Sequence, residues 1–304
     1  MREAFADLMV ELGSEDNSLV VLVGDISHGI LKPFKMNHPD RYYNIGICEP
    51  SMVNLAAGLS KVGLNPVVHT IAPFLIERSF EQIKLDFGYQ KLGVNLISVG
   101  GAFDYSQLGC SHHCYTDVSL VSHIEGSKVF MPGNVHEFKK LFRNSYKDNS
   151  INYFRLSEHP HTIDTSKYPI DIGRALITRP GTEITIATCG AQLSNAHAAA
   201  EKLSCLGIES EIVYFPTIKP FDSTTLRRSV EKTKRLITVE ELSSQDGLFN
   251  LAIQSSIGVP GLKVKQLAIN GFIRGYGNYS DLCARAGLTS ENITIEIQKL
   301  MNKE

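Results

Sequence analysis

The 304-residue sequence has no tryptophan, no long apolar run and almost no net charge. No stretch approaches the roughly 20 apolar residues that a membrane-spanning helix needs. A formal net charge of −2 gives no reason to expect nucleic acid or a membrane surface as a partner. Six scattered cysteines form no disulfide framework, and the N-terminus lacks the apolar core of a signal peptide. We therefore expect reduced thiols and a cytoplasmic location.

Two kinds of ligand motif are also missing. No Gly-x-Gly-x-x-Gly follows an apolar strand, which argues against a generic Rossmann nucleotide binder. Two cysteines and two histidines, Cys110, His112, His113 and Cys114, lie within five positions. Their spacing fits no common zinc pattern, so we expect this chain to supply no metal site of its own.

Short apolar segments alternate with amphipathic ones along the whole chain. Strands are expected at 19–25, 66–70, 94–99, 128–132, 184–190, 210–214, 235–240 and 264–269, and helices at 2–13, 74–85, 135–146, 193–206, 223–232 and 289–302. This alternation predicts an α/β protein with parallel sheets. A polar stretch with two prolines, residues 156–169, interrupts it. We expect two doubly wound domains, at 1–160 and 176–304, joined by a linker at 161–175.

One acidic residue stands at a helix entrance in the stretch 44–59. Glu49 precedes Pro50, a residue suited to the first turn of a helix, and Val53, Ala56 and Ala57 follow at helical spacing. Such an acid can simply interact with the helix dipole. It can also be a desolvated acid that holds a proton near neutral pH. The residues alone leave both interpretations open.

The stretch 44–59 resembles a segment of the pyrimidine-binding domain of thiamine-diphosphate enzymes, and of transketolases in particular. Residues 185–190, 215–222 and 238–241 resemble transketolase segments in the same order. The resemblance covers nearly the whole chain. It implies a pyrimidine-binding domain followed by a transketolase C-terminal domain, and transfer of a two-carbon ketol unit from a ketose to an aldose in carbohydrate metabolism.

The resemblance implies four cofactor contacts. Glu49 matches the glutamate that hydrogen-bonds a ring nitrogen of the aminopyrimidine, so that the cofactor's own imino group can take the thiazolium proton in a dry site. Phe74 and Phe80 match an aromatic segment that packs the pyrimidine, although a plain apolar helix face also explains them. Asp25 matches an aspartate near the thiazolium, although a simple turn residue is the alternative.

The same resemblance implies a substrate contact at His112. It matches a histidine that contacts the sugar, and an imidazole is suited to move protons near neutral pH. His113 stands where the family usually has glutamine, so its role stays open, as does that of Cys48 beside Glu49.

Two positions depart from the family pattern at the substrate end. Leu108 stands where an aspartate reads a sugar hydroxyl, and Glu158 where an arginine binds a substrate phosphate. A carboxylate repels a phosphate and donates no hydrogen bond to it. Arg155 is close by and is the candidate replacement, and Arg2 resembles another phosphate contact of the family. We expect a sugar with a different end group, or an unphosphorylated one.

A larger departure is the missing Gly-Asp-Gly motif, with which the family binds Mg2+ or Ca2+ and the cofactor's diphosphate. The one similar string, residues 245–247, lies in the second domain. A hard cation needs oxygen ligands and phosphates. We therefore expect this chain to hold only the pyrimidine end of thiamine diphosphate. An N-terminal transketolase subunit would hold the metal and diphosphate, and two copies of each chain would form an α2β2 tetramer.

Three other functions are compatible with these features. A beta subunit of a 2-oxoacid dehydrogenase has a similar length and the same two domains, and a deoxyxylulose-phosphate-synthase-like enzyme shares the aromatic segment and the His112 loop. A non-catalytic assembly or regulatory subunit is the alternative of another class, and the retention of Glu49 argues against it.

Overall fold

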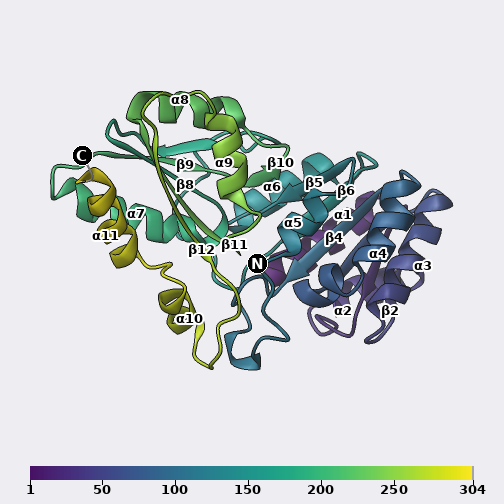
Figure 1. Ribbon diagram of the computed structural model, residues 1–304. Coiled ribbons are helices and arrows are strands. Elements are labelled where there is room, and N and C mark those ends of the chain that lie inside the picture. Colours follow the sequence, from purple (N-terminus) through teal and green to yellow (C-terminus); the bar gives the residue numbers. More distant parts are fainter. Residues whose placement is uncertain (303–304) are drawn as a thin grey trace.

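The computed structural model describes residues 1–302 and contains two α/β units, each built on one sheet with helices on both faces (Figure 1). In the first unit the regular elements are α1 (Arg2–Glu15), β1 (Leu19–Val23), α2 (Lys32–Asn37), β2 (Tyr42–Asn44), α3 (Glu49–Lys61), β3 (Asn65–Ile71), α4 (Phe80–Gln82), β4 (Val94–Val99), α5 (Asp117–Ser122), β5 (Ser127–Phe130), α6 (Val135–Ser145) and β6 (Ile151–Arg155). No helix among residues 1–302 is both long and apolar enough to span a bilayer.

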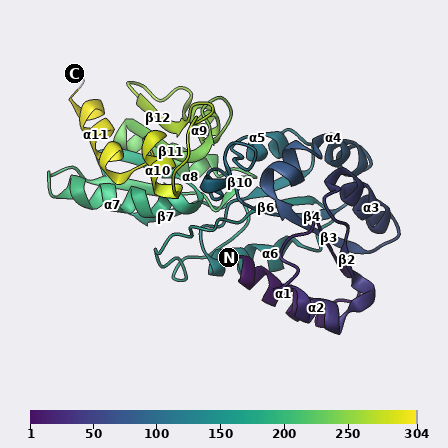
Figure 2. The same ribbon diagram turned by 90° about the horizontal axis from the view of Figure 1, so that it is seen from below.

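The first sheet has seven strands in the order β10-β5-β6-β4-β3-β1-β2. Its pairings are parallel except that of β10 with β5. Strands such as β1 and β4 are buried along their whole length, as expected for parallel strands covered on both faces. Helices α1, α2 and α6 cover one face and α3, α4 and α5 the other (Figure 2).

The second unit contains β7 (Leu176–Arg179), β8 (Ile184–Thr188), α7 (Leu193–Ser204), β9 (Ser210–Tyr214), β10 (Thr217–Lys219), α8 (Ser223–Thr233), β11 (Arg235–Ser243), α9 (Leu248–Ser256), β12 (Lys263–Ile269), α10 (Tyr279–Arg285) and α11 (Ser290–Met301). Its sheet has the order β12-β11-β8-β9-β7, and only β7 is antiparallel. Helices α7 and α11 lie on one face, and α8 and α9 on the other (Figure 1).

Strand β10 crosses from one unit to the other. It follows β9 in the chain but pairs with β5, with Thr217 opposite Phe130, at the edge of the first sheet. The ammonium of Lys219 donates to the carbonyls of Ser122 and Ile124, at 2.8 Å each, and to the hydroxyl of Ser127. A segment that the sequence places in the second domain therefore completes the sheet of the first.

Two stretches differ from the sequence-based expectation. The polar stretch 26–39, where the sequence pattern predicts no helix, contains α2, and a 3-10 turn at Pro39–Arg41 follows it. The single helix expected at 74–85 is three pieces: a π-helix at Pro73–Glu77, the short α4 and a second π-helix at Ile83–Tyr89. A π turn inserts one residue per turn, which shifts the helical face and is frequent at functional sites.

Candidate cofactor and substrate site

Five adjacent strands of the first sheet end at the same edge. Strands β2, β1, β3, β4 and β6 are neighbours, and each pairing between them is parallel. Ligands of such sheets bind outside the carboxyl ends of the strands. The chain passes from these ends into Glu49 after β2, Asp25 after β1, Phe74 after β3, His112 after β4 and Glu158 after β6.

Glu49 is the first residue of α3 and is only 1% exposed. Its Oε2 accepts a hydrogen bond from Arg78 Nη1 at 2.7 Å. The guanidinium of Arg78 also lies over the ring of Phe74, 4.2 Å from its centroid. Arg78 is not among the site residues expected from the sequence, although its spacing of four residues from Phe74 would place the two on one face of a helix.

The Glu49–Phe74 pair is suited to a flat nitrogen-bearing ring. A planar group already donates to the carboxylate and stacks on the phenyl face, and that group is the guanidinium of Arg78. An aminopyrimidine is likewise planar and carries nitrogen atoms at its rim. The Arg78 side chain is 42% exposed, so it is free to turn toward solvent. The residues present therefore fit the pyrimidine end of thiamine diphosphate.

Asp25 lies in a turn that holds the Glu49 entrance to the end of β1. Its φ of 55° is unusual for a non-glycine residue. The side chain of Asn44 binds it twice, accepting from the Asp25 amide and donating to its Oδ1, both at 3.1 Å. The same Asn44 oxygen accepts from the amide of Gly46, three residues before Glu49.

Phe80 lies apart from this cluster. It begins α4 and is partly buried against the apolar core that contains Leu75 and Ile83. Within residues 1–302 no ring contact joins it to Phe74 or His112.

His112 continues the line of contacts outward from Phe74. Its ring meets Phe74 edge to face at 5.2 Å and Tyr105 at 6.4 Å. Its Nδ1 lies 3.0 Å from the hydroxyl of Ser111. Partial burial lowers the pKa of His112 below its ordinary value, which favours the neutral ring.

His113 is enclosed by the protein, unlike the partly exposed His112. It is buried and meets Phe103 edge to face at 5.4 Å. Cys110 is exposed whereas Cys114 is buried. No group of three or more His, Cys, Asp or Glu side chains in the described part of the chain is arranged to hold a metal ion.

Arg2, Tyr105 and Glu158 form a group beyond His112. The Nε of Arg2 lies 3.8 Å from the Glu158 carboxylate, and its Nη1 is 3.5 Å from the Tyr105 hydroxyl. Tyr105 hydrogen-bonds Glu158, and burial together with the charge of Glu158 raises the pKa of this phenol to about 12. The buried carboxylate of Asp104 accepts from the Glu158 amide, and desolvation raises the pKa of Asp104 to about 7.

Arg155 has a different position from the one expected. It is buried, and its Nη2 donates to the carbonyls of Cys114 and Glu241 while Nε lies 3.5 Å from Asp117. A Cβ at Gly101 would lie 1.9 Å from the Arg155 Nε, so the arginine is packed against bare backbone. These contacts tie the two units together and leave Arg155 enclosed, which makes it a poor candidate for a substrate contact.

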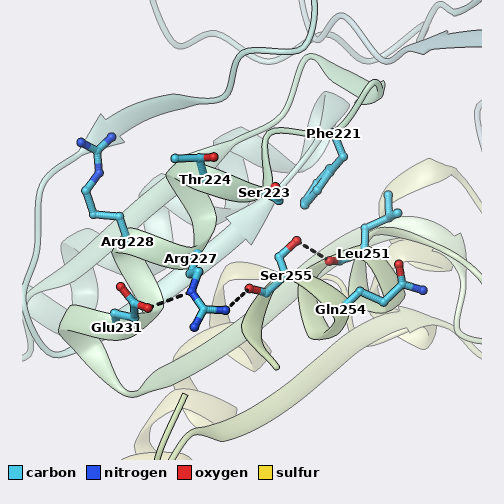
Figure 3. A pocket seen from close by; sticks show the side chains of 9 residues that line it. All are labelled: Phe221, Ser223, Thr224, Arg227, Arg228, Glu231, Leu251, Gln254 and Ser255. Atoms are coloured by element: carbon cyan, nitrogen blue, oxygen red, sulfur yellow. Dashed lines mark hydrogen bonds and ion pairs between the residues drawn. The ribbon is translucent and has the colours of Figure 1, made fainter. Parts of the chain in front are cut away.

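A separate cleft of about 760 Å³ lies between α8 and α9 (Figure 3). Its most central charged group, Arg227, is already bound to Glu231 and to the carbonyls of Ser255 and Ile257. The hydroxyl of Ser255 donates to the carbonyl of Leu251. The donor groups of Arg227 and Ser255 are therefore already paired within the cleft.

Comparison with known families identifies this arrangement. The family described as "Transketolase, pyrimidine binding domain" matches residues 1–160, and "Transketolase, C-terminal domain" matches residues 173–293. The chain belongs to the transketolase family. The expected α/β fold with these two domains and the expected transketolase-type transferase subunit are confirmed, and dependence on thiamine diphosphate follows from the family.

Three similar proteins cover almost the whole chain. An apulose-4-phosphate transketolase subunit of Phocaeicola vulgatus is 28% identical over 96% of this chain and 94% of that protein. "6-deoxy-6-sulfo-D-fructose transketolase subunit SqwH" of Clostridium sp. (strain MSTE9) is 28% identical over 96% and 92%. The solved structure "Split gene transketolase, inactive beta4 tetramer" has a TM-score of 0.88 and 27% identity over 100% of this chain and 98% of that one.

Proposed function

We propose that this chain is the C-terminal subunit of a split transketolase and holds the pyrimidine end of thiamine diphosphate at Glu49 and Phe74. The observation that carries the proposal is a continuous line of side-chain contacts at the carboxyl edge of the first sheet. It runs from Glu49 through Arg78, Phe74 and His112 to Tyr105. One end suits the cofactor, and the other is left for the substrate.

Each side chain has a defined task in this proposal. Thiamine diphosphate, when bound, stabilises the negative charge that develops as the ketose carbon–carbon bond breaks. Glu49 hydrogen-bonds a ring nitrogen of the pyrimidine, and Phe74 stacks on the ring. The neutral His112 accepts or returns a proton at a substrate hydroxyl. Asp25, held in its turn by Asn44, places one more carboxylate near the positive part of the cofactor.

We further propose that an N-terminal transketolase subunit completes the site, that it holds Mg2+ or Ca2+ and the diphosphate, and that the enzyme is an α2β2 tetramer. Two similar proteins are described as transketolase subunits, and the similar structure as an inactive tetramer of one chain. The surface beside Glu49 supports a partner, since Ile47 is 72% exposed two residues before it and Leu55 of α3 is also exposed. Exposed apolar groups that gather in one region mark interfaces.

A cleft of about 610 Å³ next to Asp25 belongs to the same region. Its lining includes Lys32, Lys35, Met36 and Tyr42. The side chain of Met36 is exposed. We propose that the partner subunit covers this cleft when the cofactor is bound between the chains.

The substrate end of the line favours a sugar without a terminal phosphate. Glu158 is bound to both Arg2 and Tyr105, so the one arginine there is already neutralised. A dianionic phosphate would have to displace Glu158 and lie beside its charge. A neutral hydroxyl-bearing end can instead donate to Glu158.

Co-purification with the candidate N-terminal subunit, followed by calorimetric titration with thiamine diphosphate and Mg2+, tests the proposal. We expect binding in the mixture and none in the isolated chain. Ketol transfer by the mixture would support the transketolase reaction, whereas 2-oxoacid decarboxylation or deoxyxylulose-phosphate synthesis would replace it. Tight cofactor binding by this chain alone would contradict the assignment of the diphosphate site to the partner.

Glu49→Gln tests the central residue in the same assay. The amide keeps the size of the side chain but cannot hold the pyrimidine nitrogen as an acid, so we expect kcat to fall at least about 100-fold. Glu81→Gln, an exposed acid on the neighbouring α4, is the matched control and should stay near wild type. Full activity of Glu49→Gln in the assembled enzyme would instead favour a non-catalytic assembly or regulatory role for this chain.

A further inference from the structure

One segment of the second domain reaches the substrate end of the site. It comprises the connection between β12 and α10 together with Tyr279, the first residue of α10, and we refer to it as the 270–279 segment. It lies beside the 100–112 loop of the first domain, and the two descend together at the lower edge of Figure 1. Nothing in the function proposed above uses this segment.

Two aromatic side chains of the segment contact the His112 loop on either side of His112. The ring of Phe272 meets Tyr115 edge to face at 6.2 Å. The ring of Tyr276 lies over Gly109, where an added Cβ would be 3.3 Å from its Cε1. Gly109 and Tyr115 are each three residues from His112, so the contacts are symmetric about it in the sequence.

A third aromatic side chain contacts the other substrate loop. The ring of Tyr279 stacks on His159 at 3.9 Å and 15°, directly after Glu158. The hydroxyl of Tyr279 donates to the carboxylate of Glu241 at the end of β11. Next to it, the amide of Ser243 donates to the Tyr115 carbonyl at 2.9 Å.

The segment is itself fixed at its C-terminal end. Asn278 and Asp281 form a reciprocal capping box at the start of α10. Arg285 donates to the carbonyl of Tyr276 at 3.3 Å. Gly271 and Gly275 have φ values of 88° and 145°, which side-chain-bearing residues rarely adopt. The backbone path that presents the aromatic rings is therefore specific.

We propose that the 270–279 segment is a positioning clamp for the substrate end of the site, with Phe272, Tyr276 and Tyr279 as positioning residues. The clamp holds the His112 loop and the residues next to Glu158 at a fixed separation. The inference rests on the proposed function, because it assigns the substrate to these two loops. It extends that function to the second domain, which contributes no side chain to the line from Glu49 to Tyr105.

The exposure of the two outer rings agrees with this role. Phe272 is 71% and Tyr276 75% exposed, so each uses one side for the loop contact and leaves the rest of the ring free. Because the rings are not part of the core, their removal should leave the fold intact.

Hydrogen exchange on the Phe272→Ala/Tyr276→Ala double variant tests the clamp in the isolated chain. We expect the amides of residues 105–116 to exchange about fivefold faster or more, with β3 and β4 unchanged. Ile257→Ala, in the same domain and 69% exposed, is the matched control and should leave these amides unchanged. The single variant Tyr276→Phe keeps the ring, so the amides of residues 105–116 should exchange as slowly as in the wild type. Unchanged exchange in the double variant would overturn the clamp.

Kinetics of the double variant with the N-terminal subunit tests the consequence for the substrate. We expect the KM for the sugar to rise about fivefold or more, whereas the Kd for thiamine diphosphate stays within about twofold. Faster exchange with an unchanged KM would overturn the role at the substrate end. A wild-type complex without transketolase activity would refute the proposed function, and the exchange measurement would still decide the clamp.

Discussion

Arg78 is the residue whose contacts say most about how the cofactor end works. It gives the buried Glu49 its hydrogen-bond partner and covers the face of Phe74. In the proposed site the pyrimidine uses the same carboxylate and the same ring face, so we expect the guanidinium and the cofactor to compete. We expect the Arg78 contact to stabilise the chain without cofactor and to break when the cofactor binds.

Arg78→Ala should therefore separate stability from binding. Loss of the guanidinium leaves the buried carboxylate of Glu49 unpaired. We expect this to lower the free energy of unfolding of the isolated chain by about 1–3 kcal/mol. The Kd of the assembled enzyme for thiamine diphosphate should fall or stay the same. Urea unfolding and calorimetric titration measure the two effects. A Kd that rises tenfold would mean that Arg78 contacts the bound cofactor rather than competing with it.

His69 is fully buried in β3 and supports the turn that contains Asp25. The neutral ring satisfies both neighbours, since one nitrogen can donate to the Ile97 carbonyl and the other accept from the Ser27 hydroxyl, both at 2.9 Å. Ser27 has a φ of 59°, in the same turn as Asp25. Desolvation lowers the pKa of His69 from 6.5 to about 4, although the hydrogen bond to Ile97 opposes the shift.

This depressed pKa predicts a pH dependence of stability. The unfolded chain binds a proton at His69 near pH 6.5, whereas the folded chain does so only near pH 4. The stabilisation is complete above pH 6.5 and is lost as the pH falls to 4, with a slope of up to about 1.4 kcal/mol per unit. His69→Gln should remove this slope from urea unfolding measured across the range. His123→Gln, at an exposed position, should leave it in place.

The site could be predicted only in part from single residues. Glu49 and His112 stand in local motifs, and His112 follows a strand, β4, whose end the apolar pattern places correctly. The partners of these residues come from other loops, so Arg78, Tyr105 and the enclosure of Arg155 depend on strand order. Periodicity along one segment carries no information about which strand ends are neighbours.

At the scale of elements, most features of the fold that could not be predicted from the sequence come from the strand order and from the two π-helices. The three residues of β10 are too short for an alternation pattern, and their pairing with β5 is set by the path of the chain after β9. The π turns disrupt the 3.6-residue period on which the single helix at 74–85 was based. The buried strands and the longer helices, by contrast, lie where their apolar patterns predict them.

Lys219→Met tests how firmly β10 holds the edge of the first sheet. Burial lowers the pKa of Lys219, yet its ammonium donates to three acceptors between the end of α5 and the start of β5. Methionine fills similar space and donates nothing, so we expect a loss of about 2–3 kcal/mol in unfolding free energy and faster hydrogen exchange in β5. Lys61→Met, on the exposed end of α3, should change neither. Unchanged exchange in β5 would show that backbone pairing alone fixes the edge.

At the scale of the whole molecule, the two units share their apolar cores. One buried cluster joins α1 and α6 of the first unit to α7 and α11 of the second, and another joins α3 and α5 to α8 and α9. The polar stretch 161–175 was expected to be a simple linker. It contains no helix or strand, but His161, Thr165 and Ile170 are buried. These residues are buried because they contact both units, and the amino-acid composition of the stretch does not reveal such contacts.

The partner that ties these parts together is Glu137 of α6. Its carboxylate is fully buried and accepts from His161 and Thr165 of the linker and from Tyr214 of β9. The amide of Gly133 donates to the same group at 2.7 Å. Burial alone would raise the pKa of Glu137, but the hydrogen bonds, that of His161 foremost, hold it below its ordinary value. One ionised group thus joins the first unit, the linker and the second unit.

Glu137→Ala should for this reason uncouple the two units rather than unfold one of them. Its loss leaves several buried donors without an acceptor, which we expect to cost about 3–5 kcal/mol and to split a single calorimetric transition into two. Glu125→Ala, an exposed acid of the same unit, should keep the single transition. Tyr214→Phe removes only the contact with β9 and should fall between the two. A single, merely lowered transition in Glu137→Ala would mean that the shared apolar clusters suffice to couple the units. In that case the distance between the His112 loop and the residues next to Glu158 would not depend on the Glu137 carboxylate.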